Sequence, residues 1–374
     1  MWPRRPSAKG AFGWTRDRQG DSWDVSRLAG DIVSVLTGMR RTTISDVARE
    51  AGVSTKTVSR VFNNEPNVTE AVRKRVRETA ETLNYHPNVL AQALVRRRSH
   101  LIGLVYENPS PSYVVELQMG VLDRLKDERY RLVVIPVSSV AEREREVVGL
   151  LRSAALDGVV LAPPAADNMR ILQDLTAAGI RFARIAPMDN LDAGPGNLID
   201  DVAAAREAAQ HLLDLGHRDI AVIRGDPTHA SSVARTKGYD QAFTAAGVTL
   251  AADRVKQGLF TRDSGYQAAG DLLDTSDRPT AILAQNDDMA VGALLAARER
   301  GIDVPGQLSI VGFDDSEVSR ITWPRITTVR QPVFEMAVAA ADMVIAQLDV
   351  GGETAHRDHP FQLLVRESSG PVPT

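Results

Sequence analysis

Five polar residues near position 57 carry side chains that can donate or accept hydrogen bonds. They are Thr55, Lys56, Thr57, Ser59 and Arg60. Lys and Arg donate to the O6 and N7 atoms of guanine, and Thr offers a hydroxyl and a methyl group that suit thymine. These residue types therefore favour hydrogen bonding to the edges of DNA bases. The alternative interpretation is an ordinary solvated helical face.

The segment around these residues predicts two short amphipathic helices joined by a tight turn. Residues 43–62 read TISDVAREAGVSTKTVSRVF. Thr43 and Ser54 stand where they can cap the two helices, and Asp46 completes a box-like pair with Thr43. A third helix is predicted to follow a cap at Thr69. Two helices around such a turn are a way of placing the second one in the major groove of DNA.

A small core for these helices is predicted from apolar residues at helical spacing. The residues are Ile44, Val47, Ala48, Val53, Val58, Val61, Val72, Val76 and Leu83. The charge is distributed unevenly, with net values of +2 for residues 1–38, +6 for 39–100 and −12 for 101–374. A basic segment before an acidic body indicates that the basic segment meets a polyanion.

The overall composition bounds the class of protein. The chain has 374 residues, 43% of them hydrophobic, and contains no cysteine. This length fits two or three domains, and the absence of cysteine excludes disulfides, thiolate metal sites and cysteine nucleophiles. No apolar run approaches the length of a membrane span, and the first residues lack the apolar core of a signal peptide. We therefore expect a cytoplasmic protein with no membrane partner.

From Leu101 onward, short β-rich runs alternate with helical patterns. The runs are LIGLVY, RLVVIP, DGVVLA, FARIAP, DIAVIR, TAILAQ and LSIVGF. Such alternation is typical of a parallel sheet covered by helices on both faces. A break near residues 199–202 separates two series. The sequence thus predicts an all-α helix-turn-helix head and an α/β body of two doubly wound parallel-sheet lobes that face each other across a cleft.

We predict the following domain boundaries. Residues 1–40 are either a disordered extension or the result of a misassigned start codon, in which case Met39 is the first residue of the protein. The head covers 41–86, a hinge helix and linker cover 87–100, and the body covers 101–374. Within the body, lobe one takes about 101–201 plus 333–358, and lobe two takes about 202–330 plus 359–374.

Polar side chains follow the expected strands of lobe two. Asp314 lies just past LSIVGF, Arg235 follows the loop after DIAVIR, and Asn286 and Asp287 follow TAILAQ. Ligands bind outside the carboxyl ends of the strands in open α/β sheets. Guanidinium, carboxylate and amide groups around one cleft suit the hydroxyl groups of a sugar. The alternative for Asn286 or Asp287 is to cap the helix that begins near Asp288.

Two aromatic residues are candidates for stacking on a sugar ring. Phe260 ends the segment KQGLF, and Tyr113 lies in the predicted loop after LIGLVY. Their alternative is ordinary core packing. His356 and His359 are three residues apart, a spacing that suits a solvated loop better than a metal site. A phosphate loop, a complete dinucleotide loop and an HExxH motif are all missing, so we expect neither a cofactor nor an enzyme.

Several blocks of the sequence, in order, resemble the lactose/galactose repressor (LacI/GalR) family of transcriptional regulators. The blocks are Thr43-Ile44-x-Asp46-Val47-Ala48, Ala51-Gly52-Val53-Ser54, Thr57-Val58-Ser59-Arg60-Val61, Tyr85-x-Pro87-Asn88, Leu94, GHRDIAVI (216–223), PTAILAQNDDMAVGAL (279–294), LSIVGFDD (308–315) and TTVRQP (327–332). The resemblance extends from residue 41 to about residue 369.

The resemblance implies how the head and hinge act on DNA. Leu94 matches the family's wedge leucine, which enters the minor groove at the operator centre. The alternative is that Leu94 packs the linker against the body. Gln92 departs from the arginine that the family often carries, which puts one DNA contact in doubt. The remaining residues that we expect to contact DNA are Thr43, Ser54, Asn63, Tyr85 and Asn88.

The resemblance also implies a function and a set of partners. Tyr113, Arg235, Phe260, Asn286 and Asp314 occupy the family's effector-contacting positions, although Val114 replaces a frequent second aromatic residue. We expect a homodimeric transcriptional repressor that binds a roughly palindromic operator and responds to a small molecule. A sugar is the first choice and a purine or nucleoside the second. A periplasmic sugar-binding protein and an enzyme on the same sheets are the alternatives.

Overall fold

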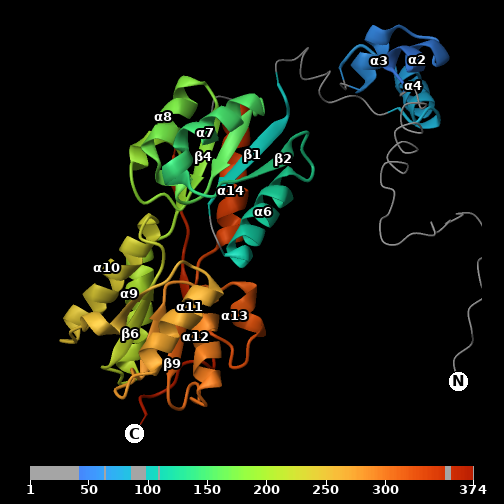
Figure 1. Ribbon diagram of the computed structural model, residues 1–374. Coiled ribbons are helices and arrows are strands. Elements are labelled where there is room, and N and C mark those ends of the chain that lie inside the picture. Colours follow the sequence, from blue (N-terminus) through green and yellow to red (C-terminus); the bar gives the residue numbers. More distant parts are fainter. Residues whose placement is uncertain (1–41, 63–64, 86–97, 108–109, 350–354, 374) are drawn as a thin grey trace, which may run out of the picture. The chain divides into compact units, whose positions relative to one another are not determined.

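The protein was analysed as a computed structural model, which describes residues 42–62, 65–85, 98–107, 110–349 and 355–373 (Figure 1). It divides into two compact units, Met1–Val89 and Leu90–Thr374. None of the helices in the described ranges is long and apolar enough to span a membrane. The predicted extension at 1–40 and the predicted hinge helix lie outside these ranges, as do the predicted DNA contacts Asn63, Asn88 and Leu94.

Within its described residues the first unit contains the helices α2 (Ile44–Glu50), α3 (Thr55–Phe62) and α4 (Glu70–Thr82). The capping box at α2 is present, because the Thr43 hydroxyl accepts from the Asp46 amide while the Asp46 carboxylate accepts from the Thr43 amide at 3.0 Å. These reciprocal bonds satisfy amides that a helix start leaves unpaired.

The start of α3 is capped as predicted, and the start of α4 is not. Ser54 Oγ accepts from the Thr57 amide at 3.1 Å. Thr69 occupies the cap position of α4, but its side chain makes no capping hydrogen bond, so that part of the prediction is wrong. The predicted core residues all belong to one apolar cluster, in which Val47, Val58 and Val76 have no exposed surface.

The first sheet of the second unit belongs to lobe one and has the strand order β11-β5-β4-β3-β1-β2. Its strands, all paired in parallel, are β1 (Leu101–Tyr106), β2 (Arg131–Pro136), β3 (Gly158–Leu161), β4 (Arg181–Ile185), β5 (Gly196–Leu198) and β11 (Arg357–Asp358). One apolar cluster joins the sheet to α6 (Pro111–Leu125) and α14 (Val333–Asp349). A separate cluster joins it to α7 (Val140–Ser153) and α8 (Met169–Ala177).

The second sheet belongs to lobe two and has the order β12-β10-β9-β8-β6-β7. Its strands are β6 (Ile220–Arg224), β7 (Val255–Gln257), β8 (Ala281–Ala284), β9 (Ser309–Asp314), β10 (Thr327–Arg330) and β12 (Gln362–Leu364). Helices α9 (Asp201–Asp214) and α10 (Ala230–Ala245) pack in the same apolar cluster as α6 and α14 of lobe one, which therefore continues through both lobes. Helices α11 (Arg262–Leu273) and α12 (Asp287–Glu299) pack in a separate cluster. The short helix α13 (Glu317–Ile321) follows β9.

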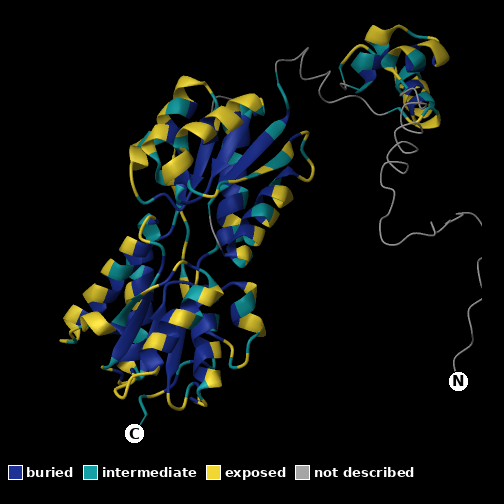
Figure 2. Cartoon of the chain, viewed as in Figure 1, coloured by how far each residue is buried: buried dark blue, intermediate teal, exposed yellow. Residues whose placement is uncertain are grey.

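The predicted fold class is confirmed, with one correction to the strand directions. Strand β12 pairs with β10 antiparallel. No helix of lobe two lies between these strands, because the chain leaves after β10 to form α14 and β11 in lobe one and then returns. A strand that returns directly needs no parallel crossover. The central strands of both sheets are buried, whereas the outer strands β2, β7, β11 and β12 are partly or fully exposed, as are the outer faces of the helices (Figure 2).

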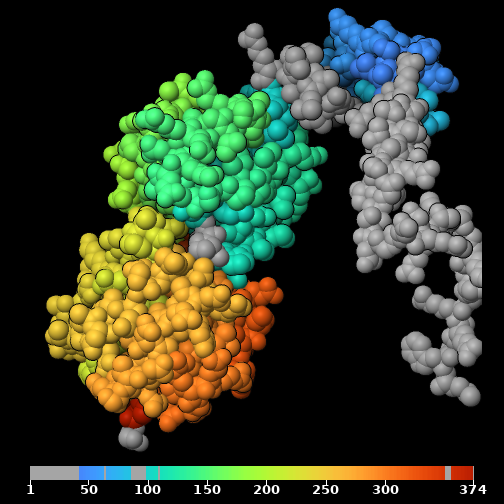
Figure 3. Space-filling view, in the orientation of Figure 1, coloured from blue at the N-terminus to red at the C-terminus, as the bar shows by residue number. Residues whose placement is uncertain are grey.

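Three connections join the two lobes. The chain passes between them after β5, after β10 and after β11. In the space-filling view a waist separates the green lobe from the yellow and orange one (Figure 3). Connections that are few and narrow allow lobes to change their mutual angle by small backbone rotations.

Two glycines allow the helices of lobe two to pack very closely. A Cβ atom at Gly238 in α10 would lie 2.3 Å from the Val202 carbonyl oxygen in α9. A Cβ atom at Gly292 in α12 would lie 2.2 Å from the Arg262 carbonyl oxygen in α11. Both distances are too short for any side chain. These contacts set how far α10 and α12 stand from their neighbours, and therefore where their first turns lie.

Candidate DNA-binding surface and ligand site

The residues expected to read DNA begin α3. Thr55 and Lys56 are exposed, and neither side chain makes a hydrogen bond or ion pair with the described residues. Arg60 is half-buried, and its Nε lies 3.6 Å from Glu65 Oε2. Thr57 Oγ1 lies 2.9 Å from Ser54 Oγ. Among the described residues, this surface therefore offers Lys56 as a cation without a partner and Arg60 as a cation paired with Glu65. The Thr57 hydroxyl takes part in the helix cap.

Two of the expected DNA contacts also have structural roles within the head. The hydroxyl and amide of Thr43 are both engaged in the capping box. The Tyr85 ring packs edge-on against Phe62 with ring centroids 5.8 Å apart. Burial raises the pKa of the Tyr85 hydroxyl. Their contact with DNA stays a prediction.

The predicted ligand site centres on Arg235 in α10, which is 5% exposed. Its Nε donates to Asp201 Oδ1 at 2.8 Å, and its Nη1 donates to the Gln285 carbonyl oxygen at 2.5 Å. Its guanidinium lies over the Phe313 ring, 3.6 Å from the centroid. Planar stacking of this kind suits a partly desolvated guanidinium. Residues from α9, β9 and the segment after β8 thus hold one cation in one orientation.

Asp314 completes the charge arrangement as predicted from its position at the end of β9. Its Oδ1 lies 3.9 Å from Arg235 Nη1 and accepts from Gln331 Nε2 at 2.5 Å. Asp314 has φ 120°, a conformation that an L-residue rarely adopts. Such outliers concentrate at ligand sites, where the surrounding structure holds them.

The trio of Asp201, Arg235 and Asp314 carries one positive and two negative charges when ionised. Burial disfavours the charge on Arg235, but Asp201 and Asp314 together raise its pKa. Burial raises the pKa of Asp201 and of Asp314, and Arg235 opposes this rise in both. Asp201 is a site residue that the sequence did not predict, since the break at 199–202 indicated only the lobe boundary. The sequence feature that could have indicated it is the pair Asp200-Asp201 at the start of a helix.

The structure assigns internal contacts to Asn286 and Asp287. Asn286 caps α12 through a hydrogen bond from the Met289 amide at 2.9 Å, and its Nδ2 donates to the Phe260 carbonyl oxygen at 2.9 Å. Asp287 has no exposed surface and accepts from Thr328 Oγ1 at 2.6 Å and from the Ser316 amide at 2.8 Å. One carboxylate oxygen of Asp287 thus binds β10 and the other binds the loop after β9, and the direct ligand contact predicted for Asp287 stays a prediction.

The two aromatic candidates lie on opposite lobes. Phe260 is 4% exposed with φ 59°, and its ring lies 5.3 Å from that of His229. Tyr113 lies in the first turn of α6 and not in a loop, which corrects its predicted position. Burial raises the pKa of the Tyr113 hydroxyl, and the charges of Asp314 and Arg235 also act on it. The Tyr113 hydroxyl of lobe one is thus near the charges of lobe two.

Two further contacts join the lobes and were not predicted. Ser110, which caps α6, donates through Oγ to the Asp288 carboxylate in α12. Arg320 in α13 lies 3.6 Å from Glu116 in α6. A change in the angle between the lobes would lengthen or shorten these contacts, so they are candidates for sensing such a change.

The C-terminal histidines have protein partners. His356 Nε2 lies 2.8 Å from the Leu191 carbonyl oxygen, and His359 Nε2 lies 3.0 Å from Asn197 Oδ1. Within the described ranges no three His, Cys, Asp or Glu residues are grouped so that they could hold a metal ion. The two histidines instead attach β11 and its flanks to lobe one.

Comparisons with known proteins agree with this geometry. A family model described as bacterial regulatory proteins, lacI family, matches residues 43–88, and one described as a periplasmic binding protein-like domain matches residues 209–369. The chain is 36% identical to the HTH-type transcriptional regulator DegA of Bacillus subtilis (strain 168) over 344 residues, which cover 89% of this chain and 100% of DegA.

Two solved structures are similar over most of the chain. A complex of the transcriptional regulator CelR with cellobiose has a TM-score of 0.66 and 31% identity, covering 88% of this chain and 100% of CelR. A crystal structure of the lac repressor dimer bound to operator and the anti-inducer ONPF has a TM-score of 0.78 and 26% identity, with the same coverage of 88% and 100%.

The buried pairing of Asp201 with Arg235 generates a stability prediction. We expect Asp201→Ala to lower the free energy of unfolding by about 3–5 kcal/mol, because it leaves a buried guanidinium with one distant carboxylate. The matched control is Asp263→Ala, which removes an exposed Arg–Asp pair of 3.1 Å and should cost less than about 1 kcal/mol. Urea unfolding measures both, and equal losses would contradict the assigned role of Asp201.

Proposed function

Because the chain belongs to the LacI family of bacterial regulatory proteins, we propose that it represses transcription and that a small neutral sugar between its two lobes controls its affinity for operator DNA. It is a DNA-binding transcriptional regulator and not an enzyme. The observation that carries the proposed control is the buried trio of Asp201, Arg235 and Asp314, whose charges act on the pKa of the Tyr113 hydroxyl in the other lobe.

The proposed DNA contacts are the exposed side chains at the start of α3. Lys56 is the unengaged cation there, and Arg60 is held only by an exposed pair with Glu65, so either can turn to a base edge at little cost. The caps at Thr43 and Ser54 support this proposal, since they order the two helices without any help from DNA. The linker at 87–100, with Leu94 as a minor-groove wedge, belongs to the same proposal.

The proposed class of ligand follows from the charges around the cleft. Arg235 is already neutralised by Asp201 and Asp314, and Asp288 adds a further carboxylate. An anionic ligand would meet repulsion that no free cation in this group relieves. Hydroxyl groups can donate to the carboxylates, and the aromatic rings can pack on a sugar ring. The cellobiose bound to CelR is consistent with this class.

The proposed control requires that the ligand prefer one angle between the lobes. The Ser110–Asp288 and Glu116–Arg320 contacts bring α6 of lobe one against α12 and α13 of lobe two. A ligand that binds the two angles unequally shifts their populations, and DNA must then change the ligand's affinity by the same factor. No chemical step on the ligand is needed.

A homodimer is proposed from an exposed apolar stripe. Val115, Met119 and Leu122 lie on one face of α6 and are 56%, 53% and 47% exposed. Ile321 and Trp323, at and just beyond the end of α13, are 73% and 70% exposed. These elements lie on the same side of the unit (Figure 1). Contiguous exposed apolar groups mark association surfaces, and two-fold pairing covers identical stripes with each other.

The DNA proposal is tested by substitutions in α3. We expect Lys56→Ala and Arg60→Ala each to weaken binding to the operator by about 1–3 kcal/mol, because each would remove hydrogen bonds to a base edge. Lys74→Ala, on α4, is the control and should change binding equally on all sequences. Gel-shift titrations of the protein's own upstream region against scrambled DNA measure these effects. Equal losses on both DNAs for the α3 variants would mean that they contact only phosphate.

The ligand proposal is tested by thermal shift with matched neutral and charged compounds. We expect some neutral monosaccharide or disaccharide to raise Tm, and its uronate or phosphorylated counterpart to have no effect. Asp314→Asn should weaken that sugar about 10-fold or more, because a charge-assisted hydrogen bond is lost. Asp271→Asn, at an exposed position of α11, is the control. A shift produced only by purines, nucleosides or anionic sugars would contradict the proposed class.

The dimer proposal is tested by placing a charge in the stripe. Met119→Glu should convert dimer to monomer, because a carboxylate buried in an apolar interface lacks a partner. Leu150→Glu on α7 is a closely matched control, since Leu150 and Met119 are both 53% exposed. Sedimentation velocity measures the outcome. A dimer that survives Met119→Glu and dissociates with Leu150→Glu would move the interface to α7.

A further inference from the structure

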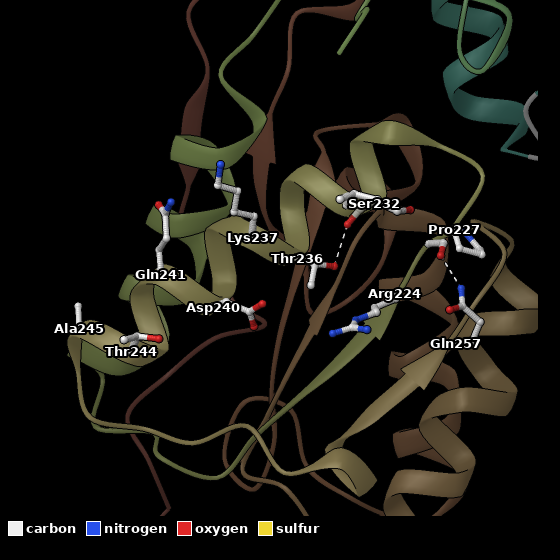
Figure 4. A pocket seen from close by; sticks show the side chains of 12 residues that line it. Arg224, Pro227, Ser232, Thr236, Lys237, Asp240, Gln241, Thr244, Ala245 and Gln257 are labelled. Atoms are coloured by element: carbon white, nitrogen blue, oxygen red, sulfur yellow. Dashed lines mark hydrogen bonds between the residues drawn. The ribbon is translucent and has the colours of Figure 1, made fainter. Parts of the chain in front are cut away.

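A cavity lies beside α10 in lobe two, between this helix and the ends of β6 and β7 (Figure 4). Its volume is about 760 Å³, and it is lined by one face of α10 from Ser232 to Ala245, by Arg224 at the end of β6 and by Gln257 at the end of β7. This size falls in the range of small-molecule sites. Arg235 is not part of its lining, so the cavity differs from the ligand site described above.

Arg224 distinguishes this cavity from the rest of the surface. Within the described ranges, every other arginine that is buried or half-buried has a guanidinium hydrogen bond or ion pair. Arg224 is half-buried and has neither, and its Nε is fully buried without a partner. Removing a charge from water without a counter-charge costs free energy. An anion bound in the cavity would pair with the Arg224 guanidinium and offset this free-energy cost.

A second unsatisfied group lies in the same wall. The Ser232 side chain is 4% exposed, and its hydroxyl makes no hydrogen bond within the described ranges. Lys237 adds a positive charge to the lining and Asp240 a negative one, so that with Arg224 the lining carries a net charge of about +1. No ion pair joins Asp240 to Arg224 or Lys237 in the described ranges, which leaves both cations available to a ligand.

We propose that this cavity is a second binding site, for a small molecule with one carboxylate or phosphate group and an uncharged, partly apolar body. Arg224 binds the oxyanion in a planar, two-pronged arrangement, with Lys237 nearby. The aliphatic carbons of Val233 and Ala245 pack against the body of the ligand. The carboxylate of Asp240 restricts the site to ligands with a single anionic group, because a second one would be repelled.

The cavity shares a wall with the site around Arg235. Gln285 has no exposed surface, and its Nε2 donates to the Ser232 carbonyl oxygen at 3.0 Å and to Thr236 Oγ1 at 2.9 Å. Its Oε1 accepts from the Gly225 amide at 2.7 Å, and its own carbonyl oxygen accepts from Arg235. An anion that moves α10 or Gly225 therefore acts on the backbone that orients Arg235. Any such coupling is reciprocal.

Calorimetry on the full chain tests the proposal with sodium benzoate and inorganic phosphate as probes, at constant ionic strength. We expect at least one probe to bind with a Kd in the millimolar range and benzyl alcohol, the uncharged analogue of benzoate, not to bind. Arg224→Gln should weaken binding about 10-fold, which corresponds to the loss of one charge-assisted contact. Arg206→Gln is the control, since Arg206 is exposed on α9 and has no partner in the described ranges.

Three outcomes would overturn the proposal. These are saturable binding of neither probe, equal binding by the Arg224→Gln protein, and equal losses with Arg206→Gln. Misfolding cannot imitate the expected result, because removing an unpaired charge should leave the Tm without ligand unchanged or higher. A site-specific measurement is the methyl NMR signal of Val233, which benzoate should shift in the unmodified protein. None of these measurements depends on operator DNA or on a sugar, so the proposed function can fail independently.

Discussion

The fold of lobe two depends on one buried cation. Arg235 is almost completely removed from water, and it stays charged because Asp201, Asp314 and the Gln285 carbonyl oxygen surround it. Those partners belong to α9, to β9 and to the segment after β8, so the ends of three elements converge on one guanidinium. A buried charge tolerates few arrangements of its partners. The same constraint that stabilises the lobe therefore keeps the two carboxylates beside the guanidinium.

That constraint connects ligand recognition to the angle between the lobes. Three connections, polar contacts such as Ser110–Asp288 and Glu116–Arg320, and an apolar cluster with members in both lobes hold the lobes together, whereas each lobe has its own sheet covered on both faces. The rigid parts are thus the lobes, and the adjustable part lies between them. A regulator with this construction needs no catalytic group. Gln285 extends the connection outward, since its side chain binds Gly225 and Ser232, which line the cavity beside α10, while its backbone carbonyl oxygen accepts from Arg235.

Most helices and strands could be predicted from the sequence because their signals lie within a few neighbouring residues. The contacts of individual side chains could not, because their partners are far away in the chain. Alternation of β-rich and helical runs is repeated along the whole chain, so the two lobes could be anticipated from Leu101 onward. Asp287 could not be classified in the same way. An acidic residue after a strand suits a ligand contact as well as a helix start, and only the positions of Thr328 and Ser316, 41 and 29 residues away, identify it as internal. Tyr113 was assigned to a loop because Ser110-Pro111, which begins α6, was not recognised as a helix start.

The sequence by itself determined the caps of α2 and α3, the core of the head, the alternating pattern of the body and the family, since periodicity, capping residues and motifs act over a few neighbouring positions. Tertiary structure alone decided that Asp201 pairs with Arg235, 34 residues away, and that β12 runs antiparallel. It also decided that, among the residues that the structure describes, Arg224 has no partner while the other half-buried arginines do. Whether a charge is paired depends on which elements pack around it, and that is a property of the three-dimensional arrangement and not of its neighbours in the chain.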